Sequence, residues 1–182
     1  MYVVYVMNNP EIVLTQAKQE NLVTYAKAFT RPWSTLEEEI KKFETYFLEQ
    51  EQGLRYFFIL EKQHIPLAYA TILYIPEYDH FKINSISEIK DLWVSPNHRN
   101  KGFGKLLMEH AEKIALEKGY SKIGLSVGLY ADYGPAQRLY ISLGYKPDGK
   151  GITYNTTYVV PGNSYPVDDE LLMWMIKIIL CN

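Results

Sequence analysis

Apolar residues recur at helical spacing in several segments of the chain. Between residues 35 and 49 they fall at Leu36, Ile40, Phe43 and Phe47, so they share one face of a helix. Thr35 starts this segment and a glutamate follows three residues later, which matches the capping box found at many helix N-termini. The same spacing predicts further helices over residues 21–29, from Phe103 to just before Gly119, and over residues 136–143.

Other segments are rich in β-branched and aromatic residues, which favour strands. Strands are expected over residues 55–61, 67–75, 86–94, 122–127, 145–154 and 171–179, with a turn at His64-Ile65-Pro66. The strands form a meander first and a β-α-β-α-β half afterwards. This order predicts an α/β fold, in which residues 1–182 form one layered domain with a central mixed, largely antiparallel sheet flanked by helices.

Composition and charge narrow the class of protein. The chain has 182 residues, 47% hydrophobic and 22% charged, which suits a globular domain with a substantial core. A net charge of -2 gives no general attraction to nucleic acid or to an acidic membrane. We expect a cytoplasmic protein, because the apolar start Met1–Met7 lacks signal-peptide features and the run 171–180 is too short to span a bilayer. Cys181 is the single cysteine, so no disulfide forms within the chain.

The most informative stretch is the glycine-rich turn Arg99-Asn100-Lys101-Gly102-Phe103-Gly104. It follows the apolar run Leu92-Trp93-Val94 and opens a predicted helix. A helix N-terminus offers unpaired backbone N–H groups and the positive end of the helix dipole, which together attract anions and phosphate above all. Arg99, Lys101 and Lys105 add positive charge at the same place. The turn therefore predicts a site for a phosphorylated cofactor.

Two common phosphate-binding motifs do not fit this turn. A dinucleotide fingerprint needs a third glycine where this chain has Leu107. A P-loop needs serine or threonine after the glycine-lysine pair, and here Leu106 follows Gly104-Lys105. The pattern that remains is Arg-x-x-Gly-x-Gly between a strand and a helix.

This pattern resembles the acetyl-CoA pyrophosphate loop of the GNAT superfamily of N-acetyltransferases. The strand before it, residues 88–96 (Glu-Ile-Lys-Asp-Leu-Trp-Val-Ser-Pro), resembles the family's fourth strand. Residues 136–145 (Ala-Gln-Arg-Leu-Tyr-Ile-Ser-Leu-Gly-Tyr) resemble its last helix and the strand that follows. The order and separation of these segments are those of the family, and the resemblance covers about residues 21–180. It implies the GNAT fold.

The resemblance also implies acetyl-CoA as the cosubstrate. Val94 would offer its backbone to the pantetheine arm, with Trp93 beside it, and the turn would hold the pyrophosphate. Many family members have an asparagine where this chain has Tyr133, so a side-chain amide contact to pantetheine is not expected here. The residues assigned to the cofactor are Trp93, Val94, Arg99, Asn100, Lys101, Gly102, Phe103, Gly104 and Lys105.

Two residues are candidates for catalysis by the same resemblance. Tyr140 stands where many members keep a tyrosine near the thioester sulfur, and its phenol would donate a hydrogen bond to the departing thiolate. It also lies on an apolar helical stripe, so a purely structural role in packing is the alternative. Glu88 stands where some members carry a general base; the alternative is a solvated glutamate at the strand end, paired with Lys90 or with a cation on a helix. Asp91 or a chain of water molecules is the reserve candidate for the base.

Other chemistries fit the chain poorly. Residues 124–128 match the Gly-x-Ser-x-Gly elbow of hydrolases, but that elbow needs a later histidine and all four histidines precede Ser126. One cysteine and four dispersed histidines give no metal-ligand spacing, so no metal is expected.

The sequence therefore predicts an acetyl-CoA-dependent N-acetyltransferase that acts directly on a primary amine in a ternary complex. A small-molecule amine is favoured, because the compact chain has no extra recognition module. A protein or peptide acceptor and a non-catalytic acyl-CoA sensor are the alternatives. The apolar C-terminal strand, if exposed, would allow a homodimer. No motif in the sequence identifies the amine or the preferred acyl chain.

Overall fold

The computed structural model describes residues 11–179, which fall into two compact units. The first unit contains residues 11–74 and Asp91–Glu109, and the second contains Ile75–Lys90 and residues 110–179. The expectations for Met1–Met7 and for Cys181 lie outside the described residues.

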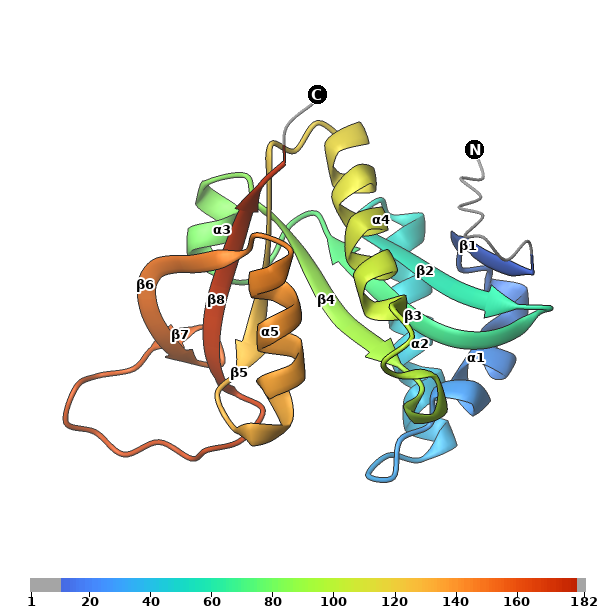
Figure 1. The fold of residues 1–182 in the computed structure, drawn as a ribbon, viewed down its shortest axis with the longest axis horizontal. Helices are drawn as coiled ribbons and strands as arrows, with labels where there is room; N and C mark the ends of the chain where they lie inside the picture. The colour runs from blue at the N-terminus through green and yellow to red at the C-terminus, as the bar shows by residue number, and fades with distance from the viewer. Residues whose placement is uncertain (1–10, 180–182) are drawn as a thin grey trace. The chain divides into compact units, whose positions relative to one another are not determined.

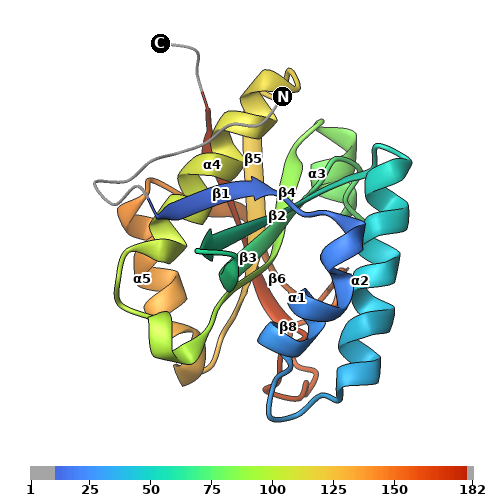
Figure 2. The same cartoon turned by 90° about the vertical axis from the view of Figure 1, so that its right-hand side faces the viewer.

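The first unit combines an antiparallel meander with two helices. Strands β1 (Ile12–Gln16), β2 (Arg55–Lys62) and β3 (Ile65–Leu73) pair in this order, followed by the second half of β4 (Ser87–Val94). Helices α1 (Leu22–Phe29) and α2 (Leu36–Glu51) lie beside one another (Figures 1 and 2). They enclose an aromatic core with β2 and β3, whose largest members are Tyr25, Phe29, Phe43, Phe47, Phe57 and Tyr69.

The predicted start of α2 is confirmed. The Thr35 hydroxyl accepts a hydrogen bond from the Glu38 N–H at 3.2 Å, and the Glu38 carboxylate accepts one from the Thr35 N–H at 2.7 Å. Both bonds satisfy donors that a helix leaves unpaired at its N-terminus. Phe43 and Phe47 are buried, as the apolar spacing predicted.

The predicted turn at His64-Ile65-Pro66 is wrong in position. The turn consists of Gln63 and His64, with φ of 49° and 65°, and Lys62 already pairs with Ile65. Two successive left-handed residues make a tight hairpin turn that matches the twist of the flanking strands. Pro66 is tolerated in β3 because the register shifts between Leu60 and Glu61 on the opposite strand.

The second unit holds the first half of β4 and then β5 (Lys122–Gly128), β8 (Leu171–Ile178), β6 (Lys146–Tyr154) and β7 (Thr157–Tyr158), in this spatial order (Figure 1). β4 and β5 are parallel, and the other pairs are antiparallel. Its helices are α3 (Asp79–Ile83), α5 (Gly134–Ser142) and the second half of α4 (Phe103–Glu117). The mixed, largely antiparallel sheet with flanking helices confirms the predicted fold class.

The condition for a homodimer through an exposed C-terminal strand is not met. β8 pairs with β5 on one side and, with a shift in register, with β6 on the other, so it is not an edge strand. Homodimer formation stays a prediction without this support. The short elements β1, α3 and β7 were not predicted, because five residues or fewer carry little periodic signal.

Candidate active site

The glycine-rich turn adopts the backbone that an anion site needs. After β4 the chain makes a short helical turn at Pro96–His98, and Asn100 and Gly102 then take left-handed φ values of 59° and 82°. The first hydrogen bond of α4 runs from the Leu106 N–H to the Gly102 carbonyl at 3.1 Å, so the preceding N–H groups have no partner within the helix. A Cβ placed on Gly102 would meet no atom within 4 Å. The turn therefore presents N–H groups next to open space, which fits the binding of a pyrophosphate.

The three cations predicted beside this turn all lie there. Lys101 Nζ donates to the Asn97 carbonyl at 3.0 Å, and Arg99 Nε donates to the Val94 carbonyl at 3.2 Å. Lys105 lies 3.7 Å from Glu109, one helical turn further along α4. These contacts are exposed, so the cations can turn toward an anion at little cost.

Trp93 connects the turn to the rest of the first unit. The Arg99 guanidinium lies over its ring at 4.9 Å and that of Arg31 at 4.6 Å, both within the range of cation–π attraction. The Trp33 ring meets it edge-on at 6.0 Å. Arg31 and Trp33 were not predicted as site residues; the signal that could have found them is an arginine and a tryptophan in a short loop between two helices.

The backbone of strand β4 departs from extended geometry at Asp91. This residue has a left-handed φ of 55°, which is rare for a residue with a side chain and costs about 1–3 kcal/mol. Its carboxylate Oδ2 accepts a hydrogen bond from the Tyr46 hydroxyl of α2 at 2.5 Å. The regular extended backbone of β4 is therefore interrupted at Asp91.

Glu88 occupies the regular half of the same strand. Ser87 and Glu88 pair in parallel register with Ile123 and Gly124 of β5. The Glu88 side chain is buried, with 2% of its surface exposed. Burial contradicts the expectation of a solvated side chain, and the role of Glu88 as a base stays a proposal.

Tyr140 lies on α5 and is also buried. Burial raises the pKa of its phenol to about 12, so the hydroxyl stays protonated at neutral pH and can donate a hydrogen bond. The Tyr145 ring lies 6.2 Å away. Burial, and then the negative charge of Glu112, raise the pKa of Tyr145 well above its ordinary value.

Tyr133 closes over the end of β5. A Cβ at Gly128 would lie 2.4 Å from its ring, so only glycine permits this approach. The Tyr133 hydroxyl donates to Asp169 at 2.9 Å, and Gln137 Nε2 donates to the Gly128 carbonyl at 2.8 Å. These contacts fix the start of α5 against the strand that precedes it.

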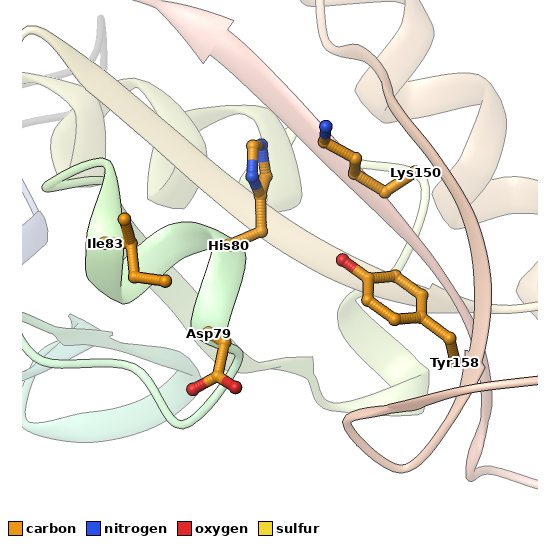
Figure 3. A pocket seen from close by; sticks show the side chains of 5 residues that line it. All are labelled: Asp79, His80, Ile83, Lys150 and Tyr158. Atoms are coloured by element: carbon orange, nitrogen blue, oxygen red, sulfur yellow. The ribbon is translucent and has the colours of Figure 1, made fainter.

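One open hollow of about 520 Å³ lies elsewhere in the second unit. Asp79, His80 and Ile83 of α3 line it together with Lys150 of β6 and Tyr158 of β7 (Figure 3). None of the predicted site residues takes part. Within residues 11–179, no three histidine, cysteine or carboxylate side chains gather as metal ligands, and no helix is long and apolar enough to cross a membrane.

Comparisons with known proteins agree with this arrangement. A family model described as the Acetyltransferase (GNAT) family matches residues 19–145. The chain is 36% identical over 59 residues to an uncharacterized N-acetyltransferase, YsnE, of Bacillus subtilis, a match that spans 32% of this chain and 39% of that protein. The fold and its glycine-rich turn define an acyltransferase-type domain, and the chain belongs to the GNAT acetyltransferase family.

Solved structures share the fold at low identity. An N-acetyltransferase from Staphylococcus aureus Mu50 has a TM-score of 0.65 at 20% identity, covering 93% of this chain and 99% of its own. A spermidine N-acetyltransferase from Vibrio cholerae in complex with CoA and spermine has a TM-score of 0.63 at 17% identity, covering 94% and 97%. The ribosomal-protein-S18-alanine N-acetyltransferase of Escherichia coli has 0.63 at 18%, covering 94% and 96%.

Proposed function

We propose that the chain transfers an acetyl group from acetyl-CoA to a primary amine, directly and in a ternary complex. The observation that carries this proposal is the left-handed turn at Asn100 and Gly102 that opens α4, inside the region matched to the family. Its N–H groups and the nearby Arg99, Lys101 and Lys105 suit a pyrophosphate. Trp93, Val94, Phe103 and Gly104 complete the set assigned to the cofactor.

The acceptor is proposed to be a small molecule. Structures with this fold include an enzyme named for spermidine and another named for a ribosomal protein, so the fold itself admits both acceptor classes. A protein or peptide acceptor is the nearest rival. A non-catalytic acyl-CoA sensor is the rival from another class, and product formation from a panel of amines separates it from an enzyme.

Acetyl transfer needs a bound thioester, a base for the amine and a proton donor for the departing thiolate. Bound acetyl-CoA supplies the thioester. The acceptor ammonium loses a proton, for which Glu88 is the proposed base and Asp91 or a water chain the reserve. The amine nitrogen then forms a bond to the acetyl carbon while the carbon–sulfur bond breaks, and the nitrogen loses its second proton, which restores the Tyr140 phenol after it has protonated the thiolate. Tyr140 is proposed to donate a proton to the departing thiolate, because its phenol is neutral and buried.

The cofactor assignment is tested with two glycines in the same conformation. Gly102 and Gly53 have φ of 82° and 73°, and a Cβ on either meets no atom within 4 Å. Gly102→Val should weaken acetyl-CoA binding by roughly 10- to 100-fold, because the side chain covers N–H groups that would bind phosphate. Gly53→Val carries the same backbone strain away from the turn and should bind normally. Isothermal calorimetry with acetyl-CoA measures both, and equal affinity of the two variants contradicts the assignment.

A further inference from the structure

A group of charged and hydroxyl side chains lies against the aromatic core of the first unit, apart from the glycine-rich turn. It joins the loop after α1, helix α2, strand β3 and the second half of β4. Its members, here called the polar cluster, are Arg31, Glu39, Lys42, Tyr46, Tyr69 and Asp91.

Tyr69 is the centre of the polar cluster. Its ring is fully buried, and its hydroxyl oxygen lies 2.8 Å from Arg31 Nη2 and 3.3 Å from Lys42 Nζ. Both cations donate to this one oxygen. Burial raises the pKa of the Tyr69 phenol, so the group that holds the two cations is neutral and does not cancel their charge.

Only one cation of the polar cluster is neutralised by a direct ion pair. Lys42 pairs with Glu39, which also accepts a hydrogen bond from Ser34 Oγ at 2.9 Å. Within residues 11–179, Arg31 forms no ion pair. Its Nε–H is buried and has no hydrogen-bond acceptor among the described residues. A buried donor without an acceptor costs about 1–3 kcal/mol, which a ligand oxygen would recover.

Asp91 carries the matching negative charge. Tyr46 engages its Oδ2, and no donor within residues 11–179 is bound to Oδ1. Burial lowers the pKa of Arg31, but Tyr69 and the carboxylates of Asp91 and Glu39 raise it. Asp91 therefore attracts the Arg31 guanidinium electrostatically. The two charges are nevertheless not paired with each other. They form a dipole with hydrogen-bonding capacity left at both ends.

An exposed aromatic side chain borders this dipole. Trp33 follows Arg31 by two residues and has 68% of its surface exposed. Its ring contacts Trp93, over which the Arg31 guanidinium lies. A large exposed indole beside a charged site offers apolar contact to the side chain of a bound molecule.

From this geometry we propose that the acceptor is a zwitterion of the amino acid class, with its ammonium bound by Asp91 and its carboxylate bound by Arg31. This inference rests on the proposed function and deepens it. A plain amine would leave the Arg31 guanidinium unpaired, and a peptide N-terminus has the ammonium without the adjacent carboxylate. Arginine is well suited to the role, because its planar fork matches a carboxylate.

The test compares pairs of ligands that differ only in the carboxylate. Phenylalanine and phenethylamine form one pair, and leucine and isoamylamine form another; an amidated dipeptide represents a peptide N-terminus. Binding to the full chain with CoA present is followed by calorimetry or by tryptophan fluorescence, so the measurement does not require turnover. The amino acids should bind roughly 10- to 100-fold more tightly than their decarboxylated partners, as expected for a charge-assisted pair.

Two variants separate the ends of the ligand. Arg31→Gln should remove the preference for the carboxylate and leave binding of the plain amines within about twofold, whereas Asp91→Asn should weaken both members of each pair. Lys27→Gln, an exposed change on α1, is the control and should alter neither. Equal binding of amino acid and amine by the unaltered protein overturns the proposal, as does an equal loss of both in Arg31→Gln or stronger binding of the dipeptide.

Failure of the proposed function has a different signature. If the chain binds acetyl-CoA but forms no acetylated product with any of these ligands, the result contradicts the proposed transferase activity. The preference for a ligand with a carboxylate is then decided separately, by the binding comparison of each amino acid with its decarboxylated partner.

Discussion

The two halves of β4 hold their carboxylates in opposite ways. Glu88 lies in a regular, paired part of the strand and is 2% exposed. Asp91 projects from a left-handed residue, is half-buried and has the Tyr46 hydroxyl bound to one oxygen. A carboxylate in a dry, fixed place suits the transfer of a proton, whereas one at a broken backbone position beside other charges suits the binding of a ligand. We therefore propose separate roles for two residues only three positions apart.

A similar contrast separates Tyr46 and Tyr69 from Tyr140. Tyr46 and Tyr69 use their hydroxyl groups in hydrogen bonds with charged neighbours. The pKa of Tyr140 is raised by burial alone. Tyr46 and Tyr69 therefore hold charged groups in place, whereas the neutral phenol of Tyr140 is the proposed donor to the thiolate.

The largest expected effect is on kcat, and it should distinguish the role of Glu88 from that of Asp91. If Glu88 is the base, Glu88→Gln should lower kcat by about 10²- to 10⁴-fold below neutral pH. The deficit should shrink as pH rises, because alkali deprotonates the amine without help. Asp91→Asn should mainly raise the KM for the amine, by about 10-fold, with little change in the shape of the pH profile. The pH dependence of kcat and KM with one amine measures both.

The reverse pattern would exchange the roles of the two residues. A pH-dependent loss of kcat in Asp91→Asn with a normal Glu88→Gln enzyme makes Asp91 the base and breaks the comparison. Normal profiles in both variants leave a water chain as the route for the proton.

A smaller effect is expected from removing the isolated phenol. Tyr140→Phe should lower the rate of acetyl transfer by roughly 10- to 1,000-fold, because the thiolate loses its proton donor. Tyr145→Phe is the matched control: it removes a buried hydroxyl 6.2 Å ring to ring from Tyr140 and should retain activity. Single-turnover measurements isolate the chemical step. Full activity of Tyr140→Phe shows that the residue only packs α5.

The smallest expected effect concerns how tightly β5 is packed at Gly124, the residue that pairs with Glu88. A Cβ on Gly124, which pairs with Glu88, would lie 2.2 Å from the fully buried Phe81 ring and 2.9 Å from the Met175 carbonyl. Gly124→Ala should therefore lower the free energy of unfolding by about 1–3 kcal/mol. Gly134→Ala, whose nearest atom would be 3.7 Å away, is the control. Urea denaturation compares the two variants, and equal midpoints would mean that β5 and its neighbours have room to move at Gly124.

Much of the fold could be predicted because its signals are local. The apolar face and capping box of α2 lie within one stretch of sequence, and the turn before α4 carries its glycines and cations together. Errors arose where conformation depends on a partner strand. The hairpin turn moved to Gln63 and His64 because the register of β2 against β3 fixes it, and β8 is internal because β5 and β6 both pair with it.

The candidate cofactor site and the polar cluster differ in the same way. The sequence by itself determined the family, the glycine-rich turn and the candidates Glu88 and Tyr140, since each rests on spacing within a short segment or on a motif. Only the tertiary structure brought Arg31, Tyr46, Tyr69 and Asp91 together, from a loop, a helix and two strands. Contacts between such distant segments follow from strand register and helix packing, and the left-handed backbone at Asp91 follows from neither composition nor periodicity.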